Sequence, residues 1–345
     1  MDTITIQTLT NELTTVFLLS GASFVLAMLL TPVYTTLAYK YKFWKKQRES
    51  STTGEKLKVF VKLHKEKFKR NIPTMAGSIA VVAVSIVTLL FNLDRAETWL
   101  PLAALIGGGA VGLLDDVINI RGDGKGVAGL RSSMKFLMIT LLGVGLGWFF
   151  AVKLGFDAVH LPFIGELSLG WFMIPVFAFA VVATGNAVNI SDGLDGLAGG
   201  LLAAAYGAFG IIAILQGHFM LAGFCFTILG ALLAYLWFNI YPARFFMGDV
   251  GSFALGTSLG VVAMLTNSFF LLPVIGIVFV VEAGSSLIQI LSKKYFHRKI
   301  FTSAPIHHHL EAAGWPETKV TMRFWVIGAV AAFTGVLLAL AGGHI

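Results

Sequence analysis

The chain has 345 residues, of which 57% are hydrophobic and only 12% are charged. This composition excludes a soluble globular enzyme and is typical of a polytopic membrane protein. The single cysteine, Cys225, excludes a disulfide framework and a cysteine-based metal site. The net charge of +7 is concentrated in a few segments, so it indicates membrane topology and argues against nucleic-acid binding.

Ten apolar segments long enough to cross a bilayer follow one another along the chain. They span residues 16–39, 75–93, 99–114, 133–152, 171–189, 194–215, 219–238, 250–266, 270–291 and 322–341. Between the fourth and fifth spans, the alternating residues Val159, Leu161 and Phe163 predict a small β-hairpin. The sequence therefore predicts an all-α membrane protein forming a single domain over residues 1–345, with both termini on one side.

Lysine and arginine predict which side that is. The connections after spans one, three, seven and nine hold 23 of the 25 basic residues, and only Arg95 and Lys153 lie in the opposite connections. Because cytoplasmic loops retain an excess of Lys and Arg, these four connections are predicted to be cytoplasmic. Both termini are then expected outside.

Acidic residues at the ends of apolar segments are the most informative feature of the chain. The predicted topology brings five of them to the cytoplasmic face: Asp115, Asp116, Asp192, Asp195 and Asp249. The first two close span three, where paired carboxylates oppose the helix dipole unless a cation is bound; a solvated helix end is the alternative. Together the five predict a cytoplasmic active-site cleft for a divalent cation and a phosphorylated substrate.

Two short runs combine carboxylates with carboxamides or an aromatic ring. In residues 186–196, the polar groups are Asn186, Asn189, Asp192 and Asp195, a set that suits a nucleobase and ribose. A helix N-cap at Asp192 is the alternative, and it explains only one of the four.

In residues 239–252, Arg244 and Phe246 suit a phosphate and a stacked ring, alongside Asn239 and Asp249. N-capping by Asp249 is the alternative there. Near span two, Lys69 precedes a Pro-Thr-Met segment containing Thr74, and this lysine is a candidate for a diphosphate.

Three consecutive histidines, His307, His308 and His309, lie in the last cytoplasmic connection. On an extended segment, His307 and His309 would share a side, which is poor spacing for zinc and better suited to phosphate or substrate positioning. Glu282 lies within span nine, where an ionised carboxylate costs about 2.5–3.5 kcal/mol. It is therefore expected to face the interior, either paired or protonated.

The chain resembles the polyprenyl-phosphate N-acetylhexosamine-1-phosphate transferases, from residue 32 onward. The shared motifs are Pro-Thr-Met-Ala-Gly from residue 73, Leu-Leu-Asp-Asp from 113, Asn-Ala-Val-Asn-Ile-Ser-Asp-Gly-Leu-Asp-Gly from 186 and Phe-Met-Gly-Asp-Val-Gly-Ser from 246. The Pro-Ile-His-His-His-Leu-Glu run from residue 305, followed by Gly-Trp-Pro-Glu, is similar to the branch with a muramoyl-pentapeptide donor.

The resemblance implies that undecaprenyl phosphate attacks the β-phosphorus of UDP-N-acetylmuramoyl-pentapeptide, giving lipid I and UMP in peptidoglycan synthesis at the bacterial inner membrane. It implies Mg²⁺, with Asp249 as its ligand, Asp115 and Asp116 at the lipid phosphate, and the histidines at the phosphates or sugar. It implies substrate-binding roles for the following residues: Lys69, Thr74, Lys125, Lys135, Asn186, Asn189, Asp192, Asp195, Asn239 and Phe246. A homodimer is an expectation of the same kind.

There are three rival interpretations, of which the first is the same chemistry on another sugar. The nearest is transfer of N-acetylglucosamine-1-phosphate, but relatives with that donor usually interrupt the histidine run. A transporter would place acidic residues near mid-membrane, where only Glu282 lies. A lipid-binding scaffold without catalysis does not require the full acidic set. An aspartyl-phosphate intermediate remains open as an alternative mechanism.

Overall fold

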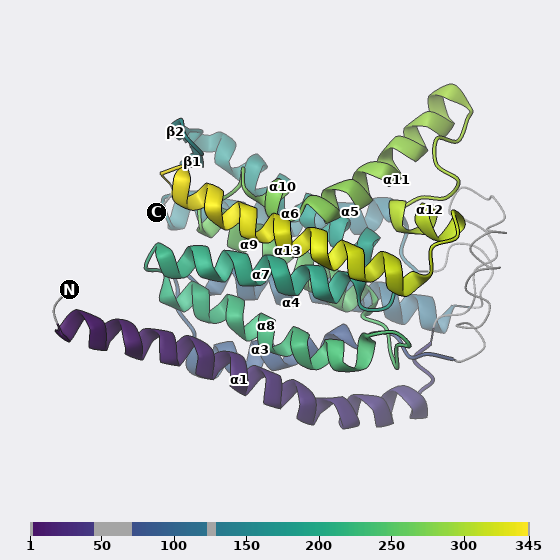
Figure 1. Cartoon of the computed structure of the whole chain (residues 1–345), viewed down its shortest axis with the longest axis horizontal. Coiled ribbons are helices and arrows are strands. Elements are labelled where there is room, and N and C mark those ends of the chain that lie inside the picture. Colours follow the sequence, from purple (N-terminus) through teal and green to yellow (C-terminus); the bar gives the residue numbers. More distant parts are fainter. Residues whose placement is uncertain (1–2, 45–70, 123–128, 344–345) are drawn as a thin grey trace.

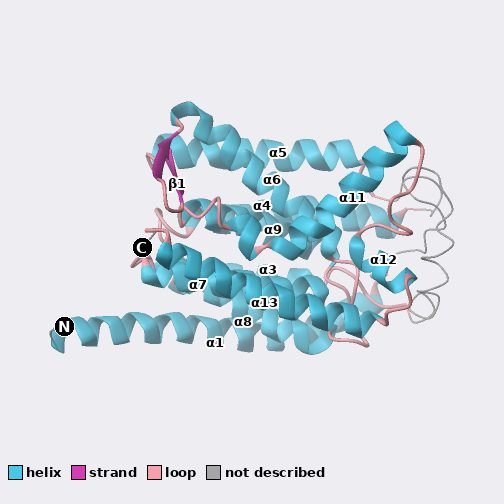
Figure 2. Cartoon of the chain, turned by 45° about the horizontal axis from the view of Figure 1, so that its top comes forward, coloured by secondary structure: helices cyan, strands magenta, loops and turns pink. Residues whose placement is uncertain are grey.

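The computed structural model describes residues 3–44, 71–122 and 129–343, and most of these residues are helical (Figure 2). The helices are α1 (Thr3–Lys40), α3 (Gly77–Phe91), α4 (Trp99–Arg121), α5 (Ser132–Trp148), α6 (Met173–Ser191), α7 (Leu197–Leu215), α8 (Phe219–Asn239), α9 (Gly248–Leu265), α10 (Leu272–Ile275), α11 (Ile277–Phe296), α12 (Ile306–Ala312) and α13 (Glu317–Ala341). Eight of them are long and apolar enough to cross a membrane. These observations confirm the all-α membrane class.

Helix α9 is the buried axis of the bundle. Every residue from Val250 to Leu265 is buried, and α4 and α6 pack along it most extensively. Small residues allow these close approaches. A side chain at Gly260 would meet the backbone of Ala180 in α6, and one at Gly108 in α4 would meet Phe253. The glycines therefore determine how closely the helices that carry the acidic motifs can approach.

The predicted hairpin is present. Strand β1 (Ala158–Leu161) pairs antiparallel with β2 (Gly165–Ser168), and Val159 lies opposite Leu167. The hairpin lies at the same end of the bundle as both termini, and α12 lies at the opposite end (Figure 1). The placement of both termini at one end agrees with an even number of spans.

The second and ninth predicted spans differ from expectation. Helix α3 is a shorter apolar helix of 15 residues. The segment 270–291 is not one helix, because α10 ends at Ile275 and α11 begins at Ile277, with Gly276 between them. Helix α11 then diverges from the bundle and carries Lys293 and Lys294 in its last turn (Figure 1). Its amphipathic sequence, with Glu282 buried inside, explains why apolar length alone mispredicted this region.

Candidate active site

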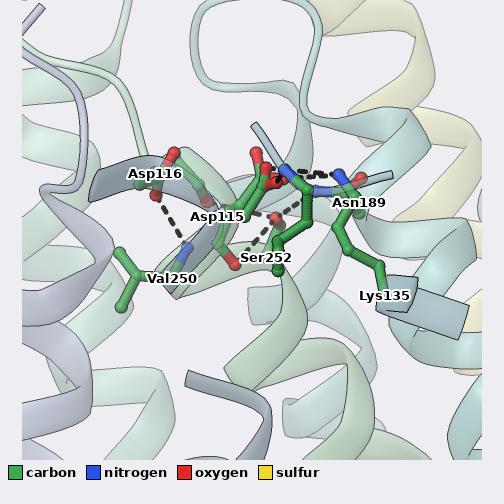
Figure 3. Close-up of polar contacts among 9 residues, drawn as sticks. Asp115, Asp116, Lys135, Asn189, Val250 and Ser252 are labelled. Carbon is green, nitrogen blue, oxygen red and sulfur yellow. Dashed lines mark hydrogen bonds and ion pairs between the residues drawn. The ribbon is translucent and has the colours of Figure 1, made fainter. Parts of the chain in front are cut away.

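Two of the predicted carboxylates converge on one cation position. Lys135, in the first turn of α5, places its Nζ atom 3.2 Å from Asp115 Oδ2 and 3.2 Å from Asp249 Oδ2. The side chains of Asp115 and Asp249 are only 3% and 15% exposed. Figure 3 shows the polar groups of α4, α5 and α9 directed toward one another. Residues separated by 134 positions along the chain therefore share one partly buried ionic site.

Close packing of α4 on α9 sets this geometry. A Cβ atom at Gly112, three residues before Asp115, would fall on the backbone carbonyl of Asp249. Gly248 has a φ of +77° and a Cβ there would lie 2.7 Å from Asp116 Oδ2. Only glycine fits at both positions, since one lacks space and the other also needs left-handed backbone. The two glycines thus bring the acidic end of α4 against the first turn of α9.

Asp116 faces the backbone of α9. Its carboxylate is fully buried and accepts a hydrogen bond of 3.0 Å from the Val250 N–H, as Figure 3 shows. The N-terminal amides of a helix lack intrahelical acceptors and carry partial positive charge, so a carboxylate is favourable there. Asp116 therefore supports the helix start that presents Asp249. The alternative of Asp249 itself as N-cap is wrong, because Asp249 lies within the first turn of α9.

The amide and aspartate run covers the last turns of α6 and the loop that leads to α7. Asn189 Nδ2 donates to Ser252 Oγ at 2.9 Å, which joins the end of α6 to α9. Asn186 donates to Val182 O within its own helix. Asp192 is the C-cap of α6 and is half-buried, so the N-cap interpretation is wrong; Gly196 occupies the N-cap of α7.

Backbone hydrogen bonds join the segment around Thr74 to the residues just before α9. Phe246 N–H donates to Pro73 O, and Ala76 N–H donates back to Phe246 O. Thr74 is buried, and its carbonyl accepts a hydrogen bond from the Tyr34 hydroxyl in α1. Phe246 is half-buried. These bonds bring two of the predicted substrate-binding residues next to Asp249.

The three histidines lie on helix α12, so they point in different directions, and His307 and His309 do not share a side as they would on an extended segment. His307 Nδ1 lies 2.7 Å from Glu282 Oε2, and both side chains are fully buried. This confirms that Glu282 faces the interior and is paired. A Cβ atom at Gly193 would fall on His307 Nε2, so the ring also touches the loop that begins at Asp192.

The other two histidines have local partners. His308 Nδ1 contacts Glu311 Oε2 at 2.7 Å, and His309 Nδ1 accepts a hydrogen bond from Thr302 N–H. Burial and the adjacent His307 ring lower the pKa of His308, against the opposing effect of Glu311. His308 is therefore a neutral ring at pH 7, where its Nδ1–H donates to Glu311 and its Nε2 is an acceptor.

Two predicted substrate-binding lysines, Lys69 and Lys125, lie outside the described residues. The sequence did not single out several polar contacts that the structure places around the site. They come from Glu311, Thr321 and Ser252, together with the pairing of Glu282 to His307. A signal exists for one group: Glu317, Thr321 and Trp325 recur every fourth residue along one face of α13, near its N-terminal end.

The carboxylates fit a magnesium ion. Within the described ranges, no cluster of three or more His, Cys, Asp or Glu side chains has metal-binding geometry. Mg²⁺ binds through one or two carboxylates and completes its shell with water and substrate phosphates. Asp115 and Asp249, which already share one cationic partner, provide that set.

This arrangement predicts that Lys135 and a divalent ion stabilise the same carboxylates. In EDTA, Lys135→Met should lower the free energy of unfolding by about 1–3 kcal/mol, and with it the melting temperature, because two partly buried carboxylates lose their shared cation. Added MgCl₂ should restore most of that loss. The measurement is thermal unfolding of the purified protein with and without Mg²⁺. Lys153→Met, shortly after the C-terminal end of α5, is the control. An equal loss of stability in Lys135→Met with and without Mg²⁺ would contradict shared binding.

The chain is similar to known membrane transferases. Residues 98–267 match the family described as glycosyl transferase family 4, which gives the class: a multi-pass membrane transferase. The chain is 39% identical to the phospho-N-acetylmuramoyl-pentapeptide-transferase of Chloroflexus aurantiacus, over 97% of this chain and 92% of that protein. Proteins of the same name from Geobacillus thermodenitrificans and Listeria monocytogenes are 37% and 36% identical, over 92% and 93% of this chain and 96% and 97% of theirs. The chain belongs to the phospho-N-acetylmuramoyl-pentapeptide-transferase family.

Proposed function

We propose that this protein transfers phospho-N-acetylmuramoyl-pentapeptide from its UDP-linked donor to undecaprenyl phosphate, giving lipid I and UMP in peptidoglycan synthesis. Membership of the family supports the reaction. The observation that links the reaction to particular residues is the convergence of Asp115 and Asp249 on one cation position. Transfer of N-acetylglucosamine-1-phosphate is not favoured, because the relatives named above carry the muramoyl-pentapeptide name over nearly the whole chain.

The reaction exchanges one phosphoanhydride bond for another. An oxygen of the lipid phosphate forms a bond to the β-phosphorus of the donor, and the bond from that phosphorus to the bridging oxygen breaks, so UMP leaves with the electron pair. Such a transfer needs charge neutralisation and alignment more than covalent assistance. Asp115 is proposed to orient the acceptor phosphate or take its proton, and the ion pairs of Lys135 with Asp115 and Asp249 support a role for Lys135 in neutralising negative charge between them.

Magnesium is the proposed cofactor, with Asp249 as ligand and Asp115 beside it. When bound, it would neutralise charge on the diphosphate. Asn189, Asp192, Asp195, Asn239 and Phe246 are proposed to form the uridine side of the site, with Thr74 and Asn186 next to them. The histidines are proposed to contact the phosphates or the sugar. An aspartyl-phosphate route is distinguished by a burst of UMP released in the absence of lipid acceptor.

The protein is a multi-pass membrane protein. We place it in the bacterial inner membrane with the site facing the cytoplasm, and the 23 basic residues in four connections support this orientation. The transporter interpretation is weakened because Glu282, which the sequence placed near mid-membrane, is fully buried and paired with His307 of the last cytoplasmic connection. A homodimer remains a prediction.

The proposed function is tested by transfer of labelled UDP-N-acetylmuramoyl-pentapeptide to undecaprenyl phosphate by the purified protein. Lipid-linked product and UMP should form in equal amounts with MgCl₂, and both should disappear in EDTA. UDP-N-acetylglucosamine should give no lipid-linked product. Product from the second donor alone would replace this proposal with the alternative sugar, and flux of donor into liposomes without UMP release would support a transporter.

A further inference from the structure

The loop at Asp195 and Gly196 has its backbone polar groups bonded by side chains from two other helices. Glu317 Oε1 accepts the Asp195 N–H at 2.7 Å, and the Thr321 hydroxyl donates to Asp195 O at 3.3 Å. Trp325 Nε1–H donates to Gly196 O at 3.1 Å, and Asn239 Oδ1 accepts the Gly196 N–H at 3.0 Å. All four backbone groups of these two residues therefore have side-chain partners.

Three of the four partners come from one face of α13. Glu317, Thr321 and Trp325 are spaced by four residues, which aligns them on one side of a helix. Thr321 is buried, whereas Glu317 and Trp325 are half-buried. An apolar membrane helix has no structural need for a row of hydrogen-bonding groups directed at one loop, since apolar packing with small residues holds such helices together.

Glycine residues in α7 make room for the indole ring. Gly196 has a φ of +76°, and a Cβ atom there would lie 3.2 Å from Trp325 Cζ2. A Cβ atom at Gly200, one turn further along α7, would fall on the indole ring itself. The ring thus lies in a recess formed by two glycines, which fixes its N–H against the Gly196 carbonyl.

Asp195 also forms a hydrogen bond with the segment that precedes Asp249. Asp195 is 2% exposed, and its Oδ2 atom accepts the Ala243 N–H at 3.0 Å. Asn239 Nδ2 donates to Phe245 O at 2.9 Å, immediately before Phe246. The segment that leads to Asp249 is therefore tied to the same loop. On the other side of the loop, Gly193 lies against His307.

We propose that Glu317, Thr321 and Trp325 are positioning residues that set the conformation of the donor-binding loop that carries Asp192 and Asp195. This inference rests on the proposed function. The three side chains act through the loop backbone and do not touch the reacting phosphates. Their loss should therefore weaken binding of the uridine donor selectively, with little effect on the lipid acceptor or on the chemical step.

The test measures donor KM, acceptor KM and kcat separately, together with UMP binding by calorimetry. Trp325→Phe keeps a six-membered aromatic ring at the recess and removes the N–H together with the pyrrole part of the indole, and Glu317→Ala removes the acceptor for Asp195. Each should raise the donor KM and the Kd for UMP by about three- to tenfold, which corresponds to the loss of one hydrogen bond. The acceptor KM and kcat should stay within about twofold. Glu317→Gln retains a carbonyl acceptor and should restore near wild-type donor KM.

Matched controls separate positioning from general stability. Thr334→Val removes an exposed hydroxyl of the same helix, and Gly207→Ala adds a methyl group to α7 where nothing lies within 4 Å. Both should leave the donor KM and the Kd for UMP unchanged. Gly200→Ala, which displaces the Trp325 ring, should reproduce the Trp325→Phe donor defect.

Parallel changes in donor KM and acceptor KM, or a fall in kcat alone, would overturn the inference. So would unchanged UMP binding in Trp325→Phe and Glu317→Ala. A wild-type protein that binds UMP but transfers nothing would contradict the proposed function and still allow the binding test. A wild-type protein that neither transfers nor binds UMP would overturn both.

Discussion

Asp249→Asn should lower the transfer rate by about 10²–10³-fold or more while leaving the fold intact, because it removes one of the two charges that converge on the cation position. Asparagine keeps the size of the side chain, and the half-buried position tolerates an amide. The measurement is initial rate of lipid-linked product formation at saturating Mg²⁺, with the melting temperature recorded for the same preparation.

The control is Asp157→Asn, an exposed aspartate next to the hairpin at the opposite end of the bundle. It changes the net charge of the protein by the same amount and should retain full activity. Equal activity in Asp249→Asn and wild type would remove Asp249 from the site. A rate loss accompanied by a collapsed melting temperature would instead make Asp249 a structural residue.

Gly112→Ala should reduce activity by at least about 100-fold and also lower stability, by about 1–3 kcal/mol or more. The added methyl group falls on the backbone carbonyl of Asp249. A backbone atom inside a packed helix cannot rotate away, so α4 and α9 must separate and Asp115 moves relative to Asp249. Misplacement of reacting groups by about 1 Å costs about 10²-fold in rate.

The matched control is Gly145→Ala in α5, where an added Cβ atom meets nothing within 4 Å. That variant should be fully active and should gain up to about 1 kcal/mol from higher helix propensity. Activity and thermal unfolding of both variants are measured side by side. Full activity of Gly112→Ala would show that the close approach of α4 and α9 does not control the site.

Much of the fold follows from apolar length and charge distribution. The first predicted span, 16–39, lies within α1, and the alternation of Val159 and Leu161 correctly predicted β1. Length alone could not show that α10 and α11 are separate helices at Gly276. A buried glutamate and a basic last turn make α11 amphipathic, and that property depends on which neighbours cover each face.

The sequence identified many residues of the candidate site, but it did not show which of them contact one another. The acidic residues were identified from their positions at helix ends, whereas the lysine between Asp115 and Asp249 was identified only by family resemblance. The sequence left open whether the histidine segment is helical or extended, because three identical side chains carry no periodicity. In the structure the segment is helical, and His307 is buried against Glu282. Partners this distant in sequence become visible only when the helices are packed.

The most direct test of the shared site is Mn²⁺ binding followed by electron paramagnetic resonance, with Mn²⁺ in place of Mg²⁺. The purified protein should bind one Mn²⁺ per chain, more tightly when UMP is present, and Asp115→Asn and Asp249→Asn should each weaken that binding at least about tenfold. Asp157→Asn should bind as wild type does. Undiminished Mn²⁺ binding by both Asp115→Asn and Asp249→Asn would contradict the account, because the two carboxylates would then not hold one ion between them.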